Sequence, residues 1–127
     1  MNDGVALLLV ALAVLATKHL VFDFFLQSLS QIRNKRIYGH PSGLLHAGGH
    51  AAGTCLAFFV ITPPVVVAIG IVVAELVLHY HIDWLKEEIG YRMALRPDQK
   101  NFWGLFGIDQ WLHQLTYVGI VFVLALT

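Results

Sequence analysis

Histidine and aspartate residues recur in pairs, four residues apart, within four separate apolar segments of this chain. The chain has seven histidines among 127 residues, although 57% of its residues are hydrophobic and only 13% are charged. Residues four apart lie on one face of a helix, about one turn from each other. Each segment therefore presents a polar pair on a single stripe. The four pairs are His19 and Asp23, His46 and His50, His79 and Asp83, and Asp109 and His113.

Imidazole nitrogen and carboxylate oxygen together form a donor set for divalent metals. Zinc, iron and manganese suit these donors, and the presence of a single cysteine, Cys55, excludes a cysteine-rich zinc site. Eight such donors exceed the needs of one ion, whereas two ions about 3.5–4 Å apart can share them. We therefore expect one or two divalent ions, with zinc favoured. Asp23, Asp83 and Asp109 are expected to act as ligands, as a bridge or as the general base.

A purely structural role is the alternative for these eight residues. Side-chain hydrogen bonds between membrane helices contribute about 1 kcal/mol each. An ionisable residue at the centre of a membrane helix costs roughly 2.5–3.5 kcal/mol. Five imidazoles and three carboxylates at one depth are expensive for a merely structural purpose, which favours a functional site.

Five further polar residues lie near these pairs. Glu75 precedes His79 by one turn, and it is either a general base, a proton-relay residue or a carboxylate hydrogen-bonded to a neighbouring helix. Four others extend the polar surface toward the charged connections and are expected to contact substrate. These four are Gln27, Lys35, Lys86 and Gln110.

The elements that must position these residues are four apolar stretches of membrane-spanning length. About 20 apolar residues suffice to cross a bilayer as a helix, and the mean hydropathy of the whole chain is +0.70. We predict an all-α fold, a four-transmembrane-helix antiparallel bundle that forms a single membrane domain over residues 1–127. The expected spans are about 5–28, 44–62, 64–86 and 105–127, with polar connections at about 29–43 and 87–104.

The four pairs lie at the same depth along the predicted spans. Counted from the outer span ends at about 1.5 Å per residue, one residue of each pair falls at a common level. The other four lie about one turn nearer the charged connections. The first level contains His19, His50, His79 and His113, and the second contains Asp23, His46, Asp83 and Asp109.

Basic residues predict the orientation and the partners. Seven of the eight lysines and arginines lie in or beside the two polar connections, which indicates that these connections are cytoplasmic and that both termini are outside. The expected partner is the lipid bilayer, and a formal net charge of zero argues against nucleic-acid binding. The glycine-rich second span makes a homo-oligomer conceivable.

The order of these elements resembles an uncharacterised family of small bacterial and phage polytopic membrane proteins, catalogued as a domain of unknown function. The elements are His-x3-Asp-x3-Gln ending at Gln27, His-x3-Asp-x2-Lys ending at Lys86, and Asp-Gln-x2-His ending at His113. The resemblance covers nearly the whole chain. It implies a multi-pass protein of the bacterial cytoplasmic membrane and supplies no activity. The pattern is more loosely similar to that of membrane-bound metal-dependent hydrolases.

Three functions remain open on these grounds. The favoured one is a metal-dependent hydrolase that acts from the cytoplasmic face on an amphipathic or lipid-linked substrate. A divalent-metal or proton carrier that uses the same cluster is the alternative. Haem ligation by two facing histidines is a third possibility, which leaves the aspartates without a role.

Overall fold

The computed structural model describes residues 3–127, and this part of the chain is helical with no strand. The all-α prediction is therefore confirmed. A π-helical turn continues the first helix, and a 3₁₀ turn continues the third. The elements are α1 (Asp3–Leu20), η1 (Val21–Phe25), α2 (Leu29–Asn34), α3 (Pro41–Thr54), η2 (Cys55–Phe59), α4 (Val65–Arg92) and α5 (Lys100–Leu124).

Two of the helical stretches are long and apolar enough to cross a membrane. They are Asp3–Phe25, with 23 residues, and Val65–Arg92, with 28 residues, and each contains an 18-residue stretch whose mean hydropathy is 2.3 and 2.1, respectively. Both exceed the roughly 20 residues that a bilayer requires. Helix α3 is shorter, with 14 residues before the chain tightens into η2. Length and composition thus identify two of the four predicted spans.

The connections are shorter and more ordered than the sequence pattern predicts. Helix α4 continues to Arg92 and α5 begins at Lys100, so the predicted connection 87–104 shrinks to residues 93–99. An ion pair between Arg92 Nε and Glu88 Oε1, at 2.7 Å, supports this last polar turn of α4. The first connection contains α2, which Ser28 and Gln31 begin with a reciprocal capping box.

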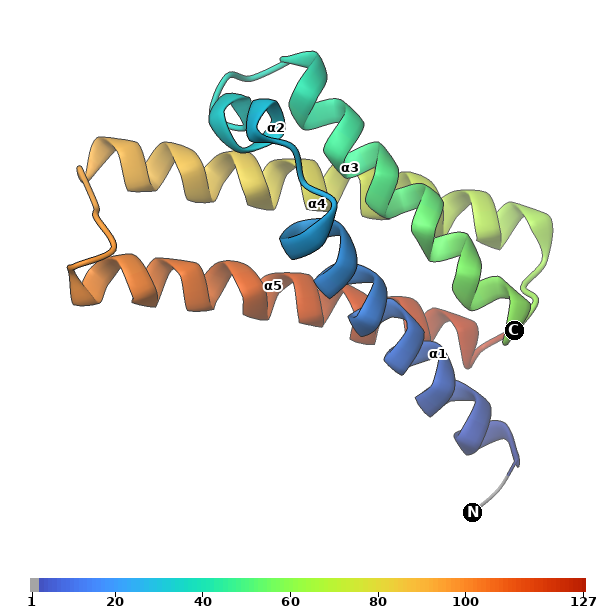
Figure 1. Cartoon of the computed structure of the whole chain (residues 1–127). Coiled ribbons are helices and arrows are strands. Elements are labelled where there is room, and N and C mark those ends of the chain that lie inside the picture. The colour runs from blue at the N-terminus through green and yellow to red at the C-terminus, as the bar shows by residue number, and fades with distance from the viewer. Residues whose placement is uncertain (1–2) are drawn as a thin grey trace.

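The long helices α4 and α5 run antiparallel, side by side, while α1 and α3 lie across them (Figure 1). Helix α3 packs against α4, and α1 packs against α5 and α3. The start of α1, the α3–α4 turn and the end of α5 lie toward one end of the molecule. The α4–α5 link lies at the opposite end. Helices α1, α3, α4 and α5 therefore come together near the middle of the molecule.

Glycines in α3 allow α1 to approach closely. A Cβ at Gly49 would lie 3.1 Å from the Phe22 ring, and one at Gly53 would lie 2.9 Å from Lys18 Cδ. A side chain at either position would force Phe22 or Lys18 to shift, because real Cβ contacts are rarely this short. The small residues of α3 therefore leave room for the side chains of α1 and η1 next to the histidines of α3.

Polarity is inverted relative to that of a soluble protein. An apolar cluster that includes Leu15, Ile71 and Ile120 fills the end near the termini. Over residues 3–127 as a whole, eleven polar or charged residues are buried, against ten apolar ones. Large apolar side chains face outward instead, and Phe59 is 87% exposed. Soluble proteins bury charged groups rarely, so this interior calls for a chemical explanation.

Candidate metal centre

The crossing of α1, α3, α4 and α5 gathers all eight residues that the four-residue spacing singled out. Each helix contributes two side chains, and all five histidines are at least 97% buried. The rings of His50 and His79 stack with centroids 3.8 Å apart, and those of His79 and His113 lie 4.3 Å apart. The His19 ring lies 4.9 Å from His113. The four histidines assigned to one level are therefore neighbours in space.

A first group of donors surrounds one carboxylate oxygen of Asp23. Asp23 Oδ1 lies 2.9 Å from His46 Nε2, 3.0 Å from His50 Nε2 and 4.0 Å from His79 Nε2. One ligand atom from each of these four residues lies within 4.8 Å of the others. Three imidazoles and one carboxylate match the four-coordinate N and O sets that hold zinc.

A second group of donors lies beside the first and shares His79. His79, Asp83 and His113 place one ligand atom each within 4.8 Å of one another. Asp83 Oδ2 lies 3.4 Å from His79 Nε2, and Asp83 Oδ1 lies 3.8 Å from His113 Nε2. His113 Nε2 is buried and has no hydrogen-bond partner among residues 3–127. A buried nitrogen left in this state is a fitting metal donor.

Two carboxylates reach both sides of the cluster. The Oδ2 atom of Asp23 lies 3.2 Å from His19 Nε2, while its Oδ1 atom faces His46 and His50. Likewise, Asp83 Oδ2 lies 3.3 Å from His46 Nε2, whereas its Oδ1 atom faces His113. Carboxylates with oxygens facing two sets of imidazoles have the arrangement needed to bridge two ions.

Hydrogen bonds on the outer ring nitrogens orient two of the histidines. His113 Nδ1 lies 2.9 Å from the Asp109 carbonyl oxygen, and His19 Nδ1 lies 2.9 Å from the Tyr117 hydroxyl. In both rings the Nε2 atom points toward the cluster. Bonds of this kind fix the orientation of metal-binding histidines and raise their basicity.

Asp23 lies in the middle of the π-helical turn η1. The Leu26 amide donates to the Val21 carbonyl at 3.0 Å, which closes the wider five-residue turn. Single π turns within α-helices occur frequently at functional sites. Local sequence does not reveal this turn, since a regular helix also places His19 and Asp23 on one face.

A cavity of about 230 Å³ leads to the cluster from the side of the connections. Lys35 reaches it from the α2–α3 connection, and its Nζ atom lies 2.8 Å from Asp83 Oδ2. Gln27 Nε2 lies 3.2 Å from His46 Nε2, and Gln110 Oε1 lies 3.1 Å from His19 Nε2. The polar residues around the cavity are Asp23, Gln27, Lys35, Asp83, Lys86, Glu87, Asp109 and Gln110. The four residues expected to contact substrate therefore all line this cavity.

Comparison with protein families shows to which family the chain belongs. The family described as "Protein of unknown function (DUF3307)" matches residues 8–127. The chain belongs to this family. The matched range contains all eight residues of the cluster. No curated protein and no solved structure matches the chain. The predicted membership of a family of unknown function is thus confirmed, while the likeness to metal-dependent hydrolases stays a prediction.

Glu75 is the one candidate that the DUF3307 chain does not bring to the histidines. Its carboxylate is bound by the Lys18 ammonium and the Thr54 hydroxyl, and all three residues are buried. Lys18 also donates to the His50 carbonyl at 3.0 Å. Because these two partners already occupy the carboxylate, we place Glu75 in this buried ion pair between neighbouring helices, and its roles as a general base or proton-relay residue stay predictions.

Three contributing residues were not among the predicted ones. Tyr117 and Thr54 each lie four residues beyond a cluster histidine, at His113 and His50. Extending the four-residue stripes by one turn would have found both. Lys18 lies off its stripe and gave no such signal. Its position depends on packing between helices, because the Lys18 side chain runs over Gly53 of α3.

Proposed function

We propose that this protein is an integral membrane metalloenzyme, a hydrolase that uses one or two divalent ions, with zinc favoured. Its substrate is amphipathic or lipid-linked and is attacked from the cytoplasmic face. The observation that carries the proposal is the buried convergence of five histidines with Asp23 and Asp83, whose oxygens face two sets of imidazoles. The adjoining cavity supplies a way in for substrate.

The inverted polarity of the fold supports a membrane location. Two helices have the length and composition of membrane spans, and exposed apolar side chains cover the outside of the helices. We propose that α3 with η2 and α5 complete a four-span protein of the bacterial cytoplasmic membrane. Most basic residues lie at the end of the molecule that holds the α4–α5 link, so the positive-inside rule places that end in the cytoplasm. Both termini are then outside.

Divalent ions in this cluster would supply Lewis acidity and activate water for attack. The protein's own side chains would then accept a proton and orient the substrate. Asp109 Oδ1 is buried and has no hydrogen-bond partner within residues 3–127, and its residue lines the cavity. Asp109 is therefore the best placed of the three aspartates to accept a proton, because the other two are held by histidines. Lys35, Gln27 and Gln110 lie where they can orient the substrate.

A divalent-metal or proton carrier is the second candidate. The buried pair of Lys18 and Glu75 extends the polar interior beyond the cluster, as a transport path would require. Beyond this pair, however, the apolar cluster containing Leu15, Ile71 and Ile120 fills the interior. The cavity therefore ends at the metal cluster, which favours the enzyme. Haem ligation is disfavoured, because imidazole rings stacked 3.8 Å apart leave no space for a porphyrin between them.

Removal and return of zinc tests the proposed reaction. Purified protein in detergent is assayed against lipid esters, lipid amides and lipid phosphates before chelation, after chelation and after zinc is added back. We expect hydrolysis of at least one class, its loss on chelation and its recovery with zinc. Metal-loaded protein that hydrolyses none of them, yet carries zinc across a liposome membrane, would overturn the enzyme in favour of the carrier.

A further inference from the structure

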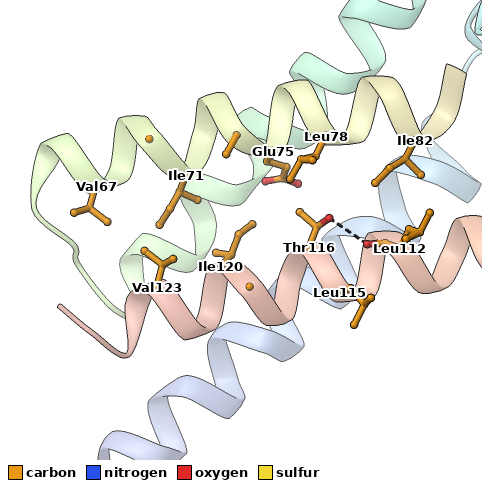
Figure 2. A pocket seen from close by; sticks show the side chains of 13 residues that line it. Val67, Ile71, Glu75, Leu78, Ile82, Leu112, Leu115, Thr116, Ile120 and Val123 are labelled. Atoms are coloured by element: carbon orange, nitrogen blue, oxygen red, sulfur yellow. Dashed lines mark hydrogen bonds between the residues drawn. The ribbon is translucent and has the colours of Figure 1, made fainter. Parts of the chain in front are cut away.

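A long apolar groove runs between α4 and α5 and is lined by residues of both helices. Figure 2 shows residues of the two helices facing each other across it. Its volume is about 740 Å³, within the roughly 300–1,000 Å³ typical of small-molecule pockets. A smaller apolar pocket shares Leu78, Ile82 and Leu112 with it and continues the groove to Lys86 and Asp109.

The walls of this groove offer almost no free polar group. The Thr116 hydroxyl donates to the Leu112 carbonyl of its own helix at 3.1 Å, as the dashed line in Figure 2 shows. Glu75 reaches the groove, but its carboxylate is bound by Lys18 and Thr54. Nothing in the groove therefore requires a hydrogen-bonding ligand. An extended hydrocarbon chain matches such a surface.

A basic pocket of about 570 Å³ lies at the connection end of the same two helices. Arg33, Arg36, Lys86 and Arg96 line it, and the single acid Glu87 pairs with Lys86 at 2.7 Å. Arg36 stacks over the Tyr91 ring at 3.8 Å. Within the described chain, the guanidinium groups of Arg33 and Arg96 form no ion pair. Guanidinium groups bind phosphate through paired hydrogen bonds, so this pocket suits a phosphate.

Lys86 joins the three spaces. It lines the basic pocket, the apolar pocket that continues the groove, and the cavity beside the metal cluster. Asp109 lines the last two of these. A ligand with its phosphate in the basic pocket and its hydrocarbon chain in the groove would pass Lys86, which lines the cavity beside the histidines.

We propose that the protein binds an anionic phospholipid, with its phosphate held by Arg33, Lys86 and Arg96 and an acyl chain in the α4–α5 groove. That the bound lipid is also the substrate rests on the proposed function; the binding itself does not. Simple attraction of basic residues to the membrane surface would need neither a pocket nor a groove. Arg92 is exposed, pairs with Glu88 and lies outside the pocket, so it can contribute to that attraction but not to binding in the pocket.

Native mass spectrometry of the purified full chain tests the headgroup contacts. We expect phosphatidylglycerol to bind about tenfold more tightly than phosphatidylcholine, a difference of about 1.4 kcal/mol. The double variant Arg33→Gln/Arg96→Gln should lose this preference, and the matched control Arg92→Gln should keep it. Inorganic phosphate should compete weakly, because it cannot fill the groove. Competition by free phosphate as strong as by the lipid would overturn the proposal in favour of a soluble phosphate ligand.

A second pair of variants tests the groove. Gly119 and Gly107 are both exposed on α5, and a Cβ at either meets no atom within 4 Å, but only Gly119 lines the groove. Gly119→Phe should weaken phosphatidylglycerol binding about tenfold, whereas Gly107→Phe should not. Metal content is measured on the same samples. Equal binding of both lipids, unaffected by these variants, would overturn the lipid site even if metal were fully bound. Lipid binding with no metal would overturn only the metalloenzyme.

Discussion

Replacing His79 with glutamine is expected to abolish metal binding by the whole cluster. His79 belongs to both donor groups, and its Nε2 atom lies 3.3 Å from His46 Nε2 and 3.4 Å from Asp83 Oδ2. Loss of a residue that merely orients a ligand costs 10–100-fold in metal affinity. Loss of a shared ligand should cost more than about 100-fold. Competition with a zinc-chelating dye measures the affinity, and hydrolysis should disappear with it.

The matched control is His81→Gln, two residues along the same helix. His81 is exposed, and its ring bonds to the Val77 carbonyl at 2.7 Å and the Tyr38 hydroxyl at 3.0 Å, outside the cluster. The His81→Gln variant should bind zinc with the same affinity as the unaltered protein. Circular dichroism should show the same helix content for both variants. Unchanged zinc affinity in His79→Gln would refute the assignment of ligands.

Replacing Lys18 with methionine is expected to lower the free energy of unfolding by about 3–5 kcal/mol. The change leaves the buried carboxylate of Glu75 without its cation, while the Thr54 hydroxyl remains as its partner. The pair joins α1 to α4, and Lys18 also ties α3 through the His50 carbonyl. Denaturant unfolding in detergent, followed by circular dichroism, measures the difference.

The double variant Lys18→Met/Glu75→Leu separates charge burial from loss of packing. Replacing both members of a buried ion pair with apolar groups is often neutral or stabilising. The double variant should therefore recover most of the lost stability. Lys100→Met removes an exposed lysine and should change stability little. A double variant as unstable as Lys18→Met alone would show that the unpaired charge is not the cause.

Periodicity in the sequence predicts the composition of the cluster because helical geometry is regular. Pairs such as His79 and Asp83 lie on one stripe wherever the helix sits, and the depth count aligns four stripes across antiparallel helices. The same reasoning places Gln27, four residues after Asp23, on the stripe of His19. What periodicity supplies is which residues share a face and at what level.

The remaining features depend on contacts that no single segment contains. Glu75 shares the stripe of His79, but its partner Lys18 is on another helix and reaches it past Gly53. The groove between α4 and α5 likewise arises from the packing of distant segments. The connection 87–104 was predicted too long, because its polar residues are good helix formers that extend α4.

Elemental analysis of the unaltered protein tests the central claim most directly. The full chain is purified in detergent from zinc-supplemented cells, dialysed against metal-free buffer, and compared with His79→Gln treated in the same way. Two adjoining donor groups that share His79 predict one or two zinc ions per chain, retained through dialysis, and almost none in the variant. Zinc, iron and manganese contents of the unaltered protein no higher than those of His79→Gln would contradict the account.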